Sequence, residues 1–293
     1  MTHLTHLARR SPSGHLRRLA VALATATALA VAAWVPAPLP TPSPAAPASA
    51  SPLFWTRSFY IANADRGAMR NLGCAHRDMA GRTSLFFGSP TVVQGTYGAT
   101  LWGGANQTVA QVGELMQEFV RGYVACRRNP RNQLFVGMGT SNSAIDGKSD
   151  AWLLGHSVTW AETIKGLHAW ANRYYPGVIR VYAAWDAEPS WSTPWKAEVW
   201  MRGYAATGGR RGLQANFSAD GCPQRGAGNG GCNNGWNQHH LWNLAWRFDP
   251  SLPMPQIYAR TGANARQWQQ IDLYGARSHG DGMVFWGPMS QYT

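Results

Sequence analysis

Two carboxylates at the end of an apolar run are the residues of this sequence best suited to chemistry. Residues 179–191 read IRVYAAWDAEPSW, which places Asp186 and Glu188 two positions apart after a strand-forming run. Residues two apart in a strand point to the same face. Two carboxyl groups held close together repel, so one of them keeps its proton at neutral pH. A protonated acid beside an ionised carboxylate is the pair that cleaves glycosidic bonds.

The pair predicts distinct roles for its two members. We expect Glu188 to be the protonated general acid, because it lies further along the chain beside Pro189 and Trp191. Asp186 is expected to stay ionised and to stabilise positive charge at the sugar carbon. The alternative is an exposed loop pair, or a cap for the next helix, without a chemical role.

Two further polar residues follow expected strands. Asp220 is a candidate third carboxylate for substrate binding, although an Asp-Gly turn next to Cys222 would explain it equally well. Asn142 lies in GTSNS, residues 139–143, where amide and hydroxyl groups could meet sugar hydroxyls. An ordinary turn is the alternative for that segment.

Tryptophan supports a carbohydrate ligand. The chain holds 15 Trp residues, and a flat aromatic ring stacks on the apolar face of a sugar much as it does on other flat partners. Five of them lie at or just beyond expected strand ends and could line a groove: Trp102, Trp185, Trp191, Trp195 and Trp286. All but Trp195 are predicted to bind the sugar and are called the groove tryptophans. Packing in the core is the alternative for each.

Other chemistries lack their sequence signals. His239 and His240 are adjacent, and adjacent residues on a helix diverge, so we expect no metal site. No G-x-G-x-x-G follows the first strand, so no dinucleotide or other cofactor is expected. A serine hydrolase would carry G-x-S-x-G, whereas GHSVT at 155–159 lacks the last glycine. An esterase-like hydrolase is therefore the weakest alternative.

Strands and helices alternate along the chain, which predicts βαβ units and a parallel sheet. Strands are expected at 57–63, 83–90, 133–143, 178–186, 212–221, 254–260 and 281–290, and helices at 106–129, 157–177, 193–209, 234–248 and 263–277. The length favours a single (β/α) barrel of the TIM type with seven or eight strands, irregular between Asn63 and Arg82; an open doubly wound sheet is the alternative. Active sites of such barrels form at the C-terminal ends of the strands.

The first fifty residues differ in composition from the rest. A basic stretch precedes an apolar core at 19–34 that is short for a membrane span, and a Pro/Ala/Ser tract follows. Ala48-Ser49-Ala50 fits a cleavage site, and an uncleaved anchor is the alternative. We expect a signal peptide and Pro/Ala-rich segment at 1–50, a glycoside hydrolase-like domain at 51–293, and a secreted or extracytoplasmic location.

Four cysteines follow this segment, and an even number in an exported chain indicates two disulfides. Three pairings exist. We favour Cys74 with Cys126 and Cys222 with Cys232, because the second pair closes a short Gly-rich surface loop. A zinc site is the alternative, but no C-x-x-C spacing supports it.

The charge of the chain indicates an anionic setting. The formal net charge is +12, and removing the four arginines of the first fifty residues leaves +8. Only 14% of residues are charged and no Lys/Arg-rich run exists, which argues against nucleic acid. We therefore expect a monomer that binds polysaccharide or peptidoglycan, without a stable membrane partner.

The segment WDAEPSW resembles the D-x-E signature of the family-25 glycoside hydrolases, secreted barrel lysozymes that cut cell-wall glycan. The ending FWGPMSQYT is loosely similar to the ending of that family, and the order of elements agrees from about residue 83 onward. The resemblance implies a barrel in which Glu188 is the general acid and Asp186 its charged neighbour. The family also carries an Asp on its first strand, where this chain has Phe87, leaving only Asp65 as a candidate.

These observations predict an exported glycoside hydrolase-like protein that cleaves a cell-wall or environmental polysaccharide. The alternative is a barrel that binds glycan or cell wall without turnover.

Overall fold

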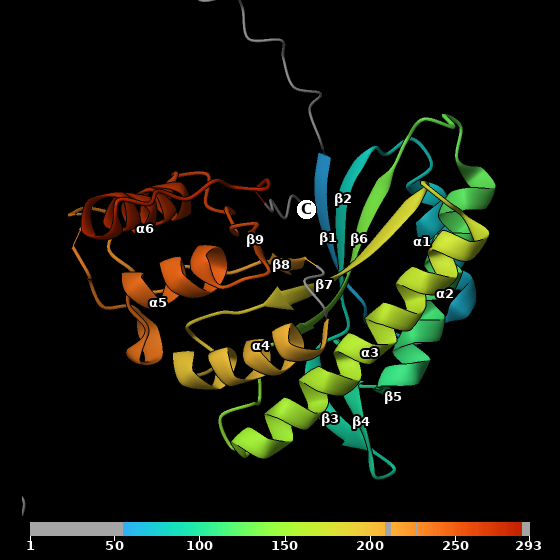
Figure 1. Ribbon diagram of the computed structural model, residues 1–293, viewed down its shortest axis with the longest axis horizontal. Coiled ribbons are helices and arrows are strands. Elements are labelled where there is room, and N and C mark those ends of the chain that lie inside the picture. Colours follow the sequence, from blue (N-terminus) through green and yellow to red (C-terminus); the bar gives the residue numbers. More distant parts are fainter. Residues whose placement is uncertain (1–54, 209–211, 227, 289–293) are drawn as a thin grey trace, which may run out of the picture. The chain divides into compact units, whose positions relative to one another are not determined.

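The computed structural model describes residues 55–208, 212–226 and 228–288, and its centre is a six-stranded parallel sheet (Figure 1). The strands are β1 (Trp55–Tyr60), β2 (Gly81–Phe86), β6 (Leu134–Ser141), β7 (Ile179–Asp186), β8 (Leu213–Ala215) and β9 (Ser251–Pro253). They lie in the sheet in this same order, and every neighbouring pair is parallel. The predicted α/β class with a parallel sheet is therefore confirmed.

Helices connect the parallel strands, and a last helix follows β9. They are α1 (Arg66–Ala75), α2 (Val109–Cys126), α3 (Asp150–Tyr174), α4 (Pro194–Gly208), α5 (Gln238–Trp242) and α6 (Ala263–His279), with a 3₁₀ turn η1 (Asn233–Gly235) and a π-helical turn η2 (Asn243–Arg247). Helix α2 begins with a capping box, in which Thr108 and Gln111 each accept from the other's backbone N–H. Helix α3 begins at its cap Ser149 rather than at the expected Ser157, which is buried within the helix.

The segment between β1 and β2 is regular, contrary to the expected irregular unit. Helix α1 makes the crossover there, and Asp65 is its N-cap: its Oδ1 accepts a hydrogen bond from the Ala68 N–H at 2.7 Å. Cys74 of α1 is bonded to Cys126, the last residue of α2, which confirms the first predicted disulfide.

A second, antiparallel sheet interrupts the expected pattern after β2. It contains β3 (Ser89–Val93), β4 (Thr96–Thr100) and β5 (Asn106–Thr108). Gln94 and Gly95 both have positive φ values, 50° and 76°, as a tight two-residue hairpin turn requires. Gly88-Ser89-Pro90 therefore leads into a new strand instead of ending an old one, and Pro90 is tolerated because β3 is an edge strand.

The parallel sheet is strongly curved. The hydroxyl of Ser84 in β2 donates to Oε1 of Gln214 in β8 at 2.5 Å, although β6 and β7 lie between these strands. In a flat sheet, three strand spacings would separate them by about 14 Å. The side chains on this face therefore meet across the inside of the curve.

The other face of the sheet packs against the helices. Along β7, Val181, Ala183 and Trp185 are buried on the helix side, where the ring of Trp185 stacks on Trp200 of α4 at 4.0 Å. Their neighbours Ala184 and Asp186 lie on the inner side by strand alternation.

Buried His156 joins three elements of this outer layer. Its Nδ1 accepts from Nε1 of Trp200 at 3.0 Å, so its Nε2 carries the hydrogen that is donated to the Gly98 carbonyl of β4 at 3.0 Å. Burial lowers the pKa of His156 to about 4, because the charged imidazolium would lose its hydration.

The last part of the chain departs from the predicted strands. β9 precedes the expected strand at 254–260, and residues 283–288 form no strand. The Trp286 N–H donates to the Pro253 carbonyl of β9 at 2.8 Å, and the Thr56 hydroxyl of β1 donates to the Pro288 carbonyl. Within the described ranges the parallel sheet thus has six strands rather than seven or eight.

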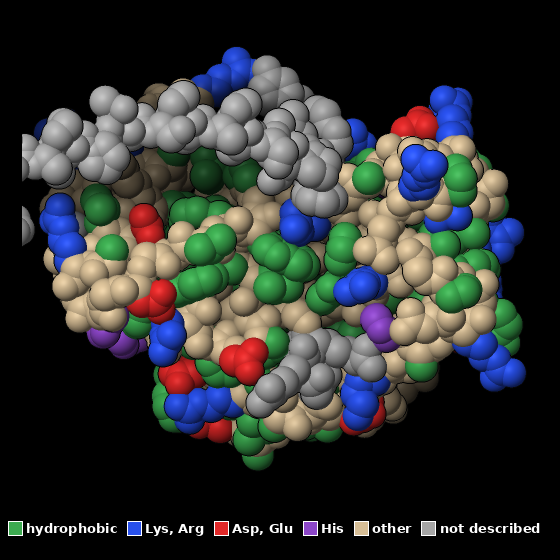
Figure 2. Space-filling model, turned by 45° about the horizontal axis from the view of Figure 1, so that its top comes forward, with side chains coloured by type: hydrophobic (Ala, Val, Ile, Leu, Met, Phe, Trp, Pro, Cys, Tyr) green, Lys and Arg blue, Asp and Glu red, His purple; other side chains and the backbone are tan. Residues whose placement is uncertain are grey.

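The predictions for residues 1–50 lie outside the described residues. None of the helices in the described part of the chain combines the length and the hydropathy that a membrane span requires. On the face shown in Figure 2, Lys and Arg side chains are scattered rather than gathered into one basic patch.

Candidate active site

Three carboxyl groups gather at the C-terminal edge of the parallel sheet, where ligands of α/β folds bind. Asp186 is the last residue of β7, Glu188 follows two residues later, and Asp220 lies five residues after β8. The charge of Asp220 acts on Glu188, and the charges of Glu188 and Asp220 act on Asp186. The structure thus brings together the predicted pair and the predicted third carboxylate.

Asp186 is fully buried in a network of amides. Its Oδ1 accepts from Nε2 of Gln256 at 2.5 Å and, more weakly, from Nδ2 of Asn216 at 3.5 Å. Three oxygens have no hydrogen-bond partner within the described residues: Asp186 Oδ2, Asn216 Oδ1 and Gln256 Oε1. All three are acceptors, and the Tyr60 hydroxyl also interacts with the Asp186 carboxyl, so a proton on Asp186 would add one further donor to this buried cluster.

The carboxyl pKa values follow from this burial. Complete desolvation and the nearby charge of Glu188 raise the pKa of Asp186 well above its usual range. Partial burial and the charge of Asp220 raise the pKa of Glu188 to about 7. Burial therefore favours the protonated form of both carboxyls, and it is complete only at Asp186. The physical reason is that the strand end is more deeply buried than the loop beyond it.

Two tyrosines complete the surroundings of Asp186. Tyr60 is the last residue of β1, and Tyr258 lies five residues beyond β9. Burial and the negative charges of Asp186 and Glu188 raise both tyrosine pKa values above the usual range, so both phenols stay protonated.

Sequence reasoning missed Tyr60, Tyr258, Gln256 and Asn216. All four occupy the end of a parallel strand or the loop that follows it. Examining that position in every strand, and not only in β7, would have found them.

Asn142 holds Glu188 through its backbone. Its Oδ1 accepts from the Glu188 N–H at 2.9 Å, and its Nδ2 donates to the Glu188 carbonyl at 3.0 Å and to the Ser192 hydroxyl at 2.8 Å. The side chain is fully buried, so both ends of its amide are engaged within the protein. Instead of the predicted contact with sugar hydroxyls, Asn142 positions the loop that carries Glu188.

Two of the four predicted groove tryptophans lie together near this edge. Trp102 is 38% exposed, and its ring lies 4.9 Å from Tyr60 and 5.8 Å from Trp191 between centroids. The Trp191 N–H donates to the Glu188 carbonyl at 3.0 Å, which places Trp191 on the same loop as the carboxylate. Trp102 and Trp191 thus form an aromatic wall beside the carboxyl groups.

The other two predicted groove tryptophans do not reach the site. Trp185 is 0% exposed against α4, because it neighbours Asp186 in the strand and must point to the opposite face. Trp286 covers the Arg82 guanidinium at 4.1 Å and contacts Tyr182 and Phe135. Arg82 and Phe135 are second residues of their strands, so Trp286 lies near the N-terminal end of the sheet.

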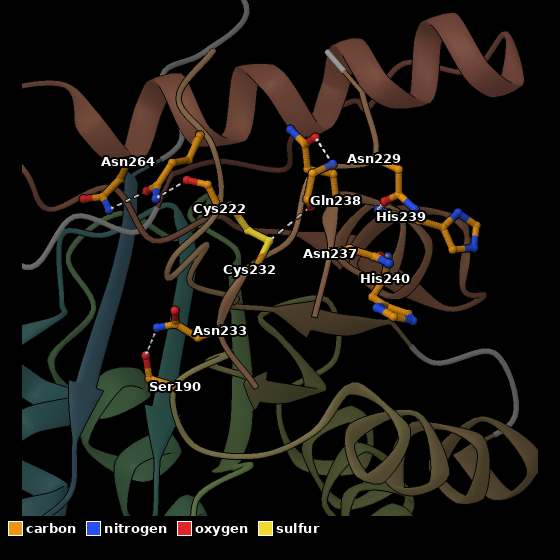
Figure 3. The surroundings of a disulfide bond; sticks show 12 residues. Ser190, Cys222, Asn229, Cys232, Asn233, Asn237, Gln238, His239, His240 and Asn264 are labelled. Atoms are coloured by element: carbon orange, nitrogen blue, oxygen red, sulfur yellow. Dashed lines mark hydrogen bonds between the residues drawn. A yellow bond between two sulfur atoms is a disulfide. The ribbon is translucent and has the colours of Figure 1, made fainter. Parts of the chain in front are cut away.

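The loops after β7 and β8 are joined beside the second disulfide (Figure 3). Cys222 and Cys232 are bonded, as predicted, and the segment between them is largely exposed. Asn233 donates to the Ser190 hydroxyl at 3.0 Å, two residues beyond Glu188. The disulfide loop therefore helps to fix the position of the carboxylate loop.

A cavity of about 400 Å³ lies away from the carboxyl groups, at the N-terminal end of β7. The residues that line it are Gln133, His168, Asn172, Gly177, Ile179, Arg180, Val181, Tyr182 and Gly212. It holds no carboxylate and forms no part of the candidate site. Within the described residues, no cluster of three or more His, Cys, Asp or Glu side chains is arranged to hold a metal ion.

Comparison with protein-family models and with curated protein sequences finds no match to this chain. The candidate site therefore rests on the geometry alone.

Proposed function

We propose that this protein is an exported glycoside hydrolase that cleaves a cell-wall or environmental polysaccharide at the edge formed by Glu188, Asp186 and Asp220. The observation that carries the proposal is a carboxyl group with a pKa of about 7, Glu188, held beside a second carboxylate and an aromatic wall. A general acid works best when its pKa lies near the operating pH. Trp102 and Trp191 supply the flat surfaces on which a sugar ring can stack.

In the proposed reaction Glu188 donates its proton to the glycosidic oxygen as the bond to the sugar carbon breaks. Asp220 provides the second carboxylate, because its charge acts directly on Glu188. It stabilises the positive charge that develops on the sugar or activates the attacking water.

Asp186 takes a positioning role in this scheme rather than the charged role first expected. As a neutral acid it accepts hydrogen bonds from the amides of Gln256 and Asn216. A neutral acid and an amide have similar shapes, so Asp186→Asn should be tolerated far better than Asp220→Asn.

The proposal includes closure of the sheet into a TIM-type barrel. The curvature that joins Ser84 to Gln214 supports it, as do the hydrogen bonds from residues 286–288 to β9 and β1. Export is supported by the two disulfides, which persist in oxidising compartments.

The test is release of reducing ends from a panel of purified cell walls and polysaccharides. Glu188→Gln and Asp220→Asn should each lower turnover by about 10²- to 10⁴-fold, while Asp186→Asn retains most of it. Equal activity of wild type and Glu188→Gln on a cleaved substrate would contradict the proposal. If Asp186→Asn loses activity and Asp220→Asn keeps it, Asp186 and not Asp220 is the ionised second carboxylate.

A glycan-binding protein without turnover is the second candidate, favoured by the proton that burial assigns to Asp186. Such a protein would bind a polysaccharide of the panel without releasing reducing ends. Its binding would weaken in Trp102→Ala and stay unchanged in Glu188→Gln.

A further inference from the structure

Three side chains, one from α5 and two from α6, lie close together and belong to none of the groups described for the candidate active site. The Tyr274 hydroxyl lies 3.2 Å from Nδ1 of His239 and 3.2 Å from Nε2 of His279. The two imidazole rings are 5.5 Å apart between centroids. Tyr274 is buried, His239 is half-buried and His279 is exposed.

We propose that His239, Tyr274 and His279 bind a divalent transition-metal ion of the zinc class. Zinc binds imidazole nitrogen at about 2.0–2.1 Å and anionic oxygen at about 2.0–2.2 Å in a tetrahedral arrangement. The edge of such a tetrahedron is about 3.3 Å long, close to both observed N···O separations. Coordination would release the phenol proton to solvent. The fourth position is left for water.

Neighbouring groups hold two of the ligands in place. The His279 ring stacks on Trp242 at 4.2 Å, and His279 lies in the last turn of the 17-residue helix α6, whose negative dipole end favours a cation. The backbone N–H of His239 donates to Oδ1 of Asn229 in the disulfide loop at 2.9 Å (Figure 3). The disulfide loop thus helps to position the start of α5, which carries His239.

The expectation of no metal considered the adjacent pair His239 and His240. Figure 3 shows their rings pointing in different directions, as adjacent helical residues must. The proposed partners of His239 are instead supplied by α6, 35 and 40 residues further along. His240 therefore offers a matched control: the same residue type at the next position, outside the proposed ligand set.

The experiment is a calorimetric titration of the full chain with Zn²⁺, in a background where His3, His6 and His15 are alanine so that the N-terminal histidines do not compete. We expect one ion per chain. His239→Ala and His279→Ala should each weaken binding by at least about tenfold, since even outer-shell changes cost 10- to 100-fold. Tyr274→Phe should also weaken it, while His240→Ala stays within about twofold.

Circular dichroism and thermal unfolding verify that each variant is folded, and Tyr274→Phe keeps the buried ring in place. Tetrahedral Co²⁺ in place of Zn²⁺ should give visible absorption bands that His279→Ala removes. Absence of saturable Zn²⁺ binding would overturn the proposal. Equal affinity of wild type, His239→Ala and His279→Ala would also overturn it, and wild-type affinity of Tyr274→Phe would exclude the three-ligand site.

Discussion

Replacing Glu188 by glutamine should stabilise the protein at alkaline pH and leave its stability at acid pH nearly unchanged. The folded protein raises the pKa of Glu188 from 4.5 to about 7. A carboxyl with a raised folded pKa binds more protons in the folded than in the unfolded state between those values. Its favourable contribution is therefore present below about pH 4.5 and is lost as the pH rises through 7. Glutamine carries no charge and removes this loss.

The magnitude follows from the pKa change. At about 1.4 kcal/mol per pKa unit, the full change corresponds to about 3 kcal/mol. Glu188 is partly exposed, so solvent screening reduces the expected effect to about 1.5–2 kcal/mol. Urea unfolding at pH 4 and pH 8, followed by fluorescence of the 15 tryptophans, gives the free energy of unfolding of both proteins. The variant-minus-wild-type difference in the free energy of unfolding is then compared between pH 4 and pH 8. Any effect of the amide that does not depend on pH cancels in this comparison.

The matched control is Glu162→Gln on α3. Glu162 is exposed and pairs with Lys165 at 2.8 Å, and exposed pairs contribute less than about 1 kcal/mol. Its variant should show almost no difference between pH 4 and pH 8. If Glu188→Gln gives the same difference at both pH values, the carboxylate is solvated or paired with a cation in solution. Burial and the charge of Asp220 would then not raise the pKa of Glu188.

Four further predictions follow from the same contacts. On any cleaved glycan, kcat/KM should fall as pH rises through about 7, where Glu188 loses its proton; activity that rises over this range would contradict the acid role. Asn142→Ala should lower the free energy of unfolding by about 2–4 kcal/mol in urea, because it deletes three buried hydrogen bonds, and should also reduce turnover. Trp185→Ala should cost about 3–5 kcal/mol by the same measurement, whereas Trp102→Ala should weaken glycan binding and leave the melting temperature unchanged. NMR of His156 should show a neutral ring with hydrogen on Nε2 down to about pH 5, since its folded pKa is about 4. Because the unfolded chain takes up the proton at a higher pH, the free energy of unfolding should fall as the pH drops from 6.5 toward 4. Titration of His156 near pH 6.5 in the folded protein would refute its burial.

The sequence alone was enough to predict the parallel α/β class, both disulfides and the meeting of Asp186 with Glu188. These features depend on local rules. The period of the hydrophobic residues distinguishes strand from helix, and the apolar run of β7 places Asp186 at its end, with Glu188 two residues later in the loop that follows. Alternation along the strand places Trp185 on the face opposite to Asp186. The amino-acid sequence therefore already implied that Trp185 does not line the groove.

Only the tertiary structure decided which groups surround the carboxyls and how deeply each carboxyl is buried. Gln256, Asn216 and Tyr60 reach Asp186 from three other strands or their following loops, because the sheet curves until distant strand ends meet. Ionisation order depends on depth of burial, which the spacing of two residues cannot reveal. The contacts of His239 were also not predictable from its neighbour His240. Adjacent residues point to different sides of one helix, whereas the contact of His239 with Tyr274 depends on how α5 packs against α6.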